Sequence, residues 1–228
     1  MFRSLTTTAL VAILCVTASS AFAQGAASPA PQAKGPPRTP PPAPLFFRED
    51  WKSGTGPGEP AVTQANISNP NLDVKLYGGG TQVVMGGGTP VHLWTGLCDR
   101  PSAIALRDKN NYVDLSGLAK IRWDEKVSGL HLVHPIVKLA DGTWLLGDHE
   151  DSNELDYHPS EFTVSEERWI KLDSDKVVTR GDWLDKSQVD LTKVDEVGFA
   201  DLMPGSGHGD GGFTDMAWIE VYGKPVPR

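Results

Sequence analysis

The stretch VGFADLMPGSGHGDGGFTDMAWIEVYG, residues 197–223, decides the fold of this chain. Apolar and polar or small residues alternate in both of its halves, most clearly at Ala217, Ile219 and Val221, and this period of two is typical of β-strands. A glycine-rich loop separates the halves. Because one face of the second half is apolar and the other carries aromatic side chains, we expect this strand to be central in its sheet. The stretch predicts an all-β sandwich.

Strand-like runs recur at short spacing along the rest of the chain, and Gly, Pro, Asn and Asp punctuate them. Residues 140–143 form a tight hairpin connection between two of these runs. No long run has the 3.6-residue period of a helix, so we expect only single helical turns, around 189–193 or near 165–167. The pattern predicts a two-sheet β-sandwich, with strands at 45–47, 72–77, 81–85, 91–94, 103–107, 118–123, 130–139, 143–146, 161–164, 168–172, 194–202 and 215–222.

The N-terminus has the features of a secretory signal peptide over residues 1–23. Arg3 is followed by an apolar run at 9–17 and by the small-residue cleavage pattern Ala21-Phe22-Ala23. Residues 24–44 hold eight prolines among 21 residues and no acidic side chain, a composition that predicts a disordered tether. Residues 45–228 are long enough for one β-sandwich domain. We therefore expect an exported protein, periplasmic or extracellular.

The charge of the expected domain is strongly negative. The first 44 residues hold three of the 21 basic residues and none of the 29 acidic ones, which leaves 18 against 29 and a net charge of −11. Such a surface disfavours nucleic acid, whose binding needs a basic patch, and anionic membranes. Cys15 falls in the signal peptide, so Cys98 has no partner for an intramolecular disulfide and is expected to be a buried thiol.

Four segments carry a resemblance to a known family, and they occur in the order YVDLSGLAKIRW (112–123), RWIKLD (168–173), VDLTKVDEVGF (189–199) and MAWIEVYG (216–223). This order resembles galactose-binding-like jelly rolls of the complex I intermediate-associated type and of some carbohydrate-binding modules. A concanavalin-like jelly roll is the nearest alternative fold. The resemblance implies a jelly-roll sandwich and a structural calcium ion, for which Glu49, Asp50 and Glu220 are the expected carboxylates.

An acidic loop at residues 147–158 combines five carboxylates with two histidines. Such a set is able to bind a metal or to supply acid and base, and we name His149 and Glu150 as candidate catalytic residues and Asp148 as a candidate ligand-binding residue. The spacing matches no established site, so a solvated acidic loop is the favoured alternative.

The glycine-rich loop within residues 201–212 surrounds His208 with five glycines. Loops of this length often carry function, and His208 with Asp201 is the first choice for a catalytic pair. The alternative is an ordered connection between strands, and the sequence favours neither.

Five of the seven tryptophans divide into two groups. Trp123, Trp169 and Trp218 lie within alternating strands and are expected to be buried. Trp94 and Trp183 adjoin turns, so they are expected to be exposed and available to stack on sugar rings.

Three functional hypotheses remain open. The leading one is a non-catalytic secreted or periplasmic domain that recognises carbohydrate. The second is a hydrolase or lyase that acts on a polysaccharide or modified sugar through His208 or His149 with nearby carboxylates. The third is an interaction or assembly module, which would expose a large apolar patch rather than a cleft. The sequence leaves the ligand and the oligomeric state open.

Overall fold

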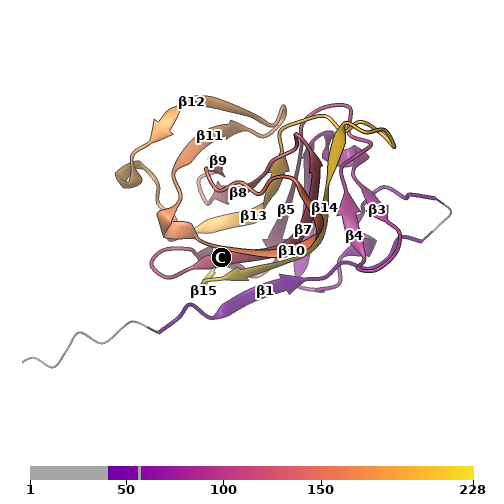
Figure 1. Cartoon of the computed structure of the whole chain (residues 1–228). Helices are drawn as coiled ribbons and strands as arrows, with labels where there is room; N and C mark the ends of the chain where they lie inside the picture. Colours follow the sequence, from indigo (N-terminus) through magenta and orange to yellow (C-terminus); the bar gives the residue numbers. More distant parts are fainter. Residues whose placement is uncertain (1–40, 56–57) are drawn as a thin grey trace, which may run out of the picture. The chain divides into compact units, whose positions relative to one another are not determined.

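Two antiparallel β-sheets enclose the main apolar core in the computed structural model (Figure 1), which describes residues 41–55 and 58–228. A smaller apolar cluster, which includes Ile136 and Trp144, is formed by residues of the nine-stranded sheet. The expected signal peptide and most of the expected tether lie outside the described residues. Every strand predicted from the sequence overlaps an observed strand, and the all-β two-sheet sandwich is confirmed. None of the helical turns in the described part of the chain has the length or hydropathy to cross a membrane.

The six-stranded sheet has β14 at its centre. β14 pairs with β7 along one side, and β4 and β1 share its other side. The expectation of a central strand at 215–222 is confirmed. The order is β10 (Glu154–Thr163), β7 (Lys120–Gly129), β14 (Gly212–Tyr222), β4 (His92–Trp94) and β3 (Val84–Gly86), with β1 (Leu45–Glu49) also on β14.

The nine-stranded sheet has β13 near its middle, between β8 and β5. Three of its strands, β6, β12 and β15, were not predicted. Its order is β12 (Val178–Leu184), β11 (Trp169–Asp173), β9 (Trp144–Gly147), β8 (Val133–Leu139), β13 (Val194–Asp201), β5 (Ser102–Asp108) and β2 (Leu72–Gly78), with β6 (Asn111–Asp114) on β13 and β15 (Lys224–Pro227) on β6.

The glycine-rich loop connects the two sheets, because β13 and β14 lie in different ones. It is therefore not a hairpin connection, and its length is needed for the crossing. The remaining elements are single 3₁₀ turns, at Gln64–Asn66 (η1), Gly79–Gln82 (η2), Val164–Glu166 (η3) and Lys186–Gln188 (η4). The turn expected near 165–167 is present, and the other lies just before 189–193.

Alternation along β7 divides its side chains between the core and the outer face of the six-stranded sheet. Ile121, Trp123 and Val127 are fully buried and join the core cluster with residues of the nine-stranded sheet. The residues between them, such as Arg122 and Lys126, are only partly buried. A strand in a two-layer sandwich must alternate in this way, because one face packs and the other meets solvent.

A β-bulge corrects the expected orientation of Trp218. Met216 lies opposite Glu125 and Trp218 lies opposite Asp124, so Ala217 is an extra residue on β14. The bulge shifts the alternation by one. Met216 before the bulge and Ile219 after it therefore both point into the core, and Trp218 is half-buried on the outer face instead of buried in the core. The expected burial of Trp123 and Trp169 is confirmed.

Candidate functional site

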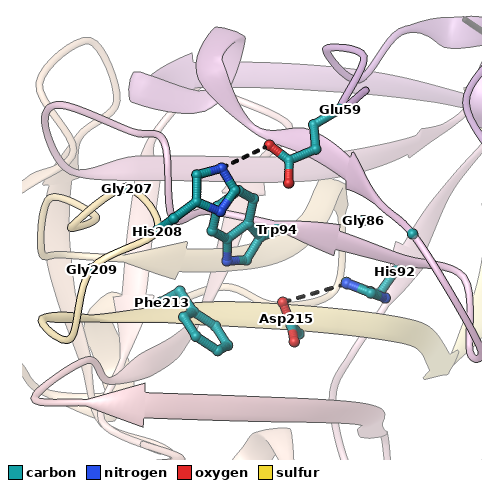
Figure 2. A pocket seen from close by; sticks show the side chains of 10 residues that line it. Glu59, Gly86, His92, Trp94, Gly207, His208, Gly209, Phe213 and Asp215 are labelled. Carbon is teal, nitrogen blue, oxygen red and sulfur yellow. Dashed lines mark ion pairs between the residues drawn. The ribbon is translucent and has the colours of Figure 1, made fainter. Parts of the chain in front are cut away.

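A pocket of about 330 Å³ lies on the outer face of the six-stranded sheet, where β3, β4 and β14 meet the glycine-rich loop (Figure 2). Strand alternation places the side chains of the pocket. His92 and Trp94 of β4 are two positions apart and point to one face, and Phe213 and Asp215 of β14 point to the same face. The lining consists of Glu59, Gly86, Gly87, His92, Trp94, Gly207, His208, Gly209, Phe213 and Asp215.

His92 and Asp215 form the first of two imidazole–carboxylate pairs in the pocket. His92 donates from Nδ1 to the carbonyl oxygen of Pro90 at 2.9 Å, which turns Nε2 toward Oδ1 of Asp215 at 3.6 Å. At this separation the two groups form no hydrogen bond, and Oδ1 of Asp215 is buried without a hydrogen-bond partner among the described residues. Burial of the Asp215 carboxylate, which is 5% exposed, raises its pKa, while His92 and Lys126 oppose the rise.

Tyr157 reaches the same carboxylate from β10. Its hydroxyl is 3.5 Å from Oδ2 of Asp215, and its ring centroid lies 5.7 Å from that of His92. A shift of register in β10 between Glu154 and His158 brings it there. Burial beside Asp215 raises the pKa of the Tyr157 hydroxyl, which therefore stays protonated and acts as a hydrogen-bond donor.

His208 and Glu59 form the second pair, at 3.3 Å between Nε2 and Oε2. The His208 side chain is 71% exposed, and Figure 2 shows its ring lying over Trp94. The loop that carries it is anchored by two backbone hydrogen bonds, from Gly205 to Cys98 and from Gly207 to Gly96, each 2.7 Å. A side chain at Gly205 would meet the Gly96 oxygen at 2.2 Å, so this close approach requires glycine.

Trp94 is less exposed than the sequence predicted, at 8%. The reason is packing on both sides: Gly96 lies against the indole, and the His208 ring lies 4.9 Å from it between centroids. The part of the indole that remains accessible lines the pocket, where the Phe213 ring stands nearly perpendicular to it at 6.2 Å.

The outer face continues beyond the pocket along β14. Two guanidinium groups contact the Trp218 ring, Arg48 at 4.5 Å and Arg122 at 5.7 Å from its centroid. Both arginines also bind Glu220, at 2.6 and 3.1 Å. Trp218 and its polar neighbours therefore lie on the same outer face of β14 as the pocket, further along the strand.

The expected catalytic pair of Asp201 and His208 is not formed. Asp201 is fully buried, and its carboxylate bonds with His131, whereas His208 is exposed and pairs with Glu59. Asp201 ends β13, whereas His208 lies further along the glycine-rich loop that leads to β14 in the other sheet. Proximity in sequence was the reason for pairing them, and the crossing between sheets separates their side chains.

The candidates of the acidic loop lie outside the pocket. His149 stacks on Phe162 at 4.0 Å and contacts Asp151 at 3.2 Å, while Glu150 is exposed. Asp148 binds Arg168, and this arginine also lies 4.9 Å above the ring of Trp183. Trp183 is 44% exposed, as predicted. These contacts give the loop local structural roles and do not bring its candidates together with His208.

The three carboxylates expected to hold calcium do not fit such a site. Both oxygens of Glu49 accept backbone N–H bonds, from Trp51, Ser68 and Asn69 at 2.6 to 3.0 Å. Asp50 and Glu220 share the guanidinium of Arg48. Within residues 41–55 and 58–228 no cluster of three metal-ligating side chains is present. Calcium binding stays a prediction.

Four important pocket residues were missed from the sequence: Glu59, His92, Phe213 and Asp215. The alternation of β4 and β14 contained a signal for three of them, because His92 shares a face with Trp94, and Phe213 shares one with Asp215. Glu59 had no such signal, since it lies in an irregular segment between strands. Cys98 is buried as expected, and burial raises its pKa to about 11.

No protein-family model and no curated protein matches the chain. Solved structures similar to it include a family 11 carbohydrate-binding module of the cellulosomal cellulase Lic26A-Cel5E of Clostridium thermocellum, at 18% identity and a TM-score of 0.42, over 75% of this chain and 97% of the module. The same type of module in complex with a β-1,3-1,4-mixed-linked tetrasaccharide has 18% identity and a TM-score of 0.41, over 76% of this chain and 100% of the module. An exo-β-agarase has 11% identity and a TM-score of 0.39, over 76% of this chain and 25% of the enzyme. Since these scores are below 0.5, the fold assignment rests on the sheets of this chain itself.

Proposed function

We propose that this chain binds carbohydrate without catalysing a reaction, through the pocket on the outer face of its six-stranded sheet. The observation that carries the proposal is the combination of aromatic and hydrogen-bonding groups at one point. Trp94 and Phe213 supply apolar faces, and Asp215, His92 and Glu59 supply polar atoms around them. Sugar rings present both kinds of surface, since their C–H faces stack on aromatic rings while their hydroxyls donate and accept hydrogen bonds.

The size of the pocket fits one or two sugar units, and the strip along β14 offers contacts to a longer chain. β14 rises about 3.3 Å per residue, so Phe213 and Trp218 stand several sugar lengths apart. Trp218 with its two arginines would contact further units by stacking and by hydrogen bonds to hydroxyls. A polysaccharide is therefore the proposed ligand class.

The test is affinity electrophoresis of the purified chain in gels that contain mixed-linked β-glucan, xylan, galactomannan or agarose. We expect retardation by at least one of these polymers and a measurable Kd by calorimetry. Trp94→Ala and Asp215→Asn are each expected to weaken binding about 10- to 100-fold, as expected for loss of ~1.5 to 3 kcal/mol of contact with a charged or stacked group.

Matched controls separate binding from folding. Trp144, in the other sheet, has the same 8% exposure as Trp94, and Asp195 is a paired carboxylate of that sheet. Trp144→Ala and Asp195→Asn should leave the Kd unchanged. If no polymer binds, or if the control variants lose affinity as much as the pocket variants, the proposed function is wrong.

A second candidate function, hydrolysis of a glycosidic bond, is favoured by one observation. The pocket contains two carboxylates, Asp215 and Glu59, and burial raises the pKa of Asp215, as required of a general acid. Release of reducing ends from the bound polymer, lost in Asp215→Asn, would support hydrolysis. Binding without release of reducing ends supports the non-catalytic proposal.

We also infer that the protein is exported, from the signal-like residues 1–23. Export would bring the pocket into contact with polysaccharide outside the cytoplasm. N-terminal sequencing of protein from the periplasm or medium of the expressing cell should begin at Gln24. Recovery of uncleaved protein from the cytoplasm alone would contradict this inference.

A further inference from the structure

We propose that Asp201 is a positioning residue, which holds the three segments of the carbohydrate pocket in their relative places from the opposite sheet. The inference rests on the proposed function of the pocket and names a residue that does not line it. Asp201 is the last residue of β13, and it is fully buried. A buried carboxylate is stable only if hydrogen bonds replace its hydration. Loss of any hydrogen-bond partner of Asp201 would therefore be costly.

The first segment bound by Asp201 is β4. Thr95 immediately follows Trp94 and donates from Oγ1 to Oδ2 of Asp201 at 2.9 Å. The same hydroxyl accepts the backbone N–H of Thr214 at 2.8 Å. Thr95 therefore connects the carboxylate with both β4 and β14, and Trp94 lies one residue from this junction.

The second segment is β14. Thr214 donates from Oγ1 to Oδ2 of Asp201 at 3.0 Å and points into the sandwich, with 0% exposure. Its neighbours Phe213 and Asp215 point the opposite way, into the pocket. Fixing the inward side chain of Thr214 consequently fixes the direction of both pocket side chains beside it.

The third segment is the glycine-rich loop. The backbone N–H of Met203, at the start of the loop, donates to Oδ1 of Asp201 at 3.1 Å. His131 completes the set from the turn between β7 and β8, with Nδ1 donating to Oδ2 at 2.7 Å, and it is 1% exposed. Every segment that supplies an aromatic or imidazole group to the pocket thus depends on one carboxylate.

Asn at position 201 cannot satisfy this set. Its amide has one oxygen acceptor where the carboxylate has two. If the NH2 group takes the Oδ2 position, it faces the three donors that Oδ2 accepted. If it takes the Oδ1 position, it faces the N–H of Met203. At least one of the contacts must be lost. The loop should loosen, and the pocket side chains should leave the arrangement in which they contact a sugar together.

The experiment compares Asp201→Asn with Glu196→Gln in the full chain. Glu196 is a matched control because it lies on the same strand, is 2% exposed, and bonds to Tyr77 and Lys138 at 2.7 and 2.9 Å, none of which supplies the pocket. Two measurements are made: hydrogen exchange of the backbone amides by mass spectrometry, and the Kd for whichever of the four polymers named above binds the wild type most tightly.

We expect Asp201→Asn to raise the exchange rate of loop residues 203–211 at least tenfold and to weaken polymer binding at least tenfold. Glu196→Gln should change neither. Thr214→Val, which removes one hydroxyl contact, should reproduce both effects in smaller degree, and Thr214→Ser should restore them to wild-type values. If Asp201→Asn does not fold, the Thr214 pair decides the question.

Unchanged loop exchange and unchanged Kd in Asp201→Asn, or in Thr214→Val where that variant decides, would overturn the inference. An equal loss in Glu196→Gln would do the same, because it would indicate a general effect of buried charge. Failure of the wild type to bind any of the four polymers contradicts the proposed function instead. The exchange measurement still decides whether Asp201 holds the loop.

Discussion

The imidazole ring of His208 lies 4.9 Å from the ring of Trp94 between centroids, tilted by 39°. This contact covers the aromatic residue that the proposed function needs for stacking, and Glu59 holds the imidazole from the other side. A sugar ring must therefore either share the indole with His208 or displace it. In both cases His208 changes affinity through its position over Trp94.

His208→Ala is predicted to change polymer affinity while leaving stability nearly unaltered. The side chain is 71% exposed, and exposed substitutions usually change unfolding free energy by less than ~0.5 kcal/mol. Urea unfolding and calorimetry with the bound polymer measure the two quantities. Glu59→Gln, which removes the partner, should act in the same direction. A loss of more than ~2 kcal/mol of stability with an unchanged Kd would mean that His208 only supports the loop.

The sequence predicted most strands because the alternation of apolar and polar residues is local to each strand. β7 and β14 are recognisable from their residues alone. The sequence could not locate the bulge at Ala217, since a bulge is a relation between two strands and depends on the partner β7. Because Ala217 was not recognised as an extra residue, Trp218 was wrongly predicted to point into the core. The unpredicted strands β6, β12 and β15 lack a long apolar face, so they carried little signal.

Trp218→Ala is predicted to cost about 1 to 2 kcal/mol of unfolding free energy, the size of contacts between an aromatic ring and two partly exposed cations. Trp123→Ala should cost ~3 to 5 kcal/mol, because the Trp123 side chain is completely buried in the core. Urea melts of the two variants test the bulge directly. Equal losses would place Trp218 in the core and remove the strip along β14 from the proposed binding surface.

The candidate site was only partly predictable. His208 and Trp94 were chosen from the sequence and do line one pocket. Asp201, Glu150 and Asp148 were chosen for proximity to a histidine in sequence, but contacts between sheets and loops decide which carboxylate meets which imidazole. Asp215 and His92 are 123 positions apart in the sequence, and the pairing of β14 with β4 brings them together.

Glu49→Gln is predicted to destabilise the fold by about 1 to 3 kcal/mol, the usual cost of an unsatisfied buried group. The carboxylate accepts three backbone N–H bonds, and the amide of Gln would present a donor to at least one of them. Asp50→Asn is the control, because Asp50 is the next residue and its side chain is 52% exposed. Chemical unfolding should separate the two. Equal stabilities would mean that Glu49 is available for another role, including a cation.

The last prediction concerns pH and the buried carboxyl group of Glu125. Glu125 points into the core from β7 with 1% exposure, and burial, with Asp151 and Asp124 nearby, raises its pKa to about 8. The pKa in the unfolded chain is ~4.3. Since the folded value is the higher one, the stabilising contribution is complete below pH ~4.3 and is lost progressively as the pH rises through 8.

Glu125→Gln removes this dependence, because its amide stays neutral at every pH. The variant is expected to be more stable than the wild type at pH 9 by about 3 to 5 kcal/mol, at ~1.4 kcal/mol per pKa unit, and to match it near pH 4. Urea unfolding at both pH values measures the difference. Glu161→Gln, half-exposed on the neighbouring strand β10, should show no such divergence. Parallel stabilities of Glu125→Gln and the wild type from pH 4 to 9 would show that Glu125 ionises in the fold as readily as in water.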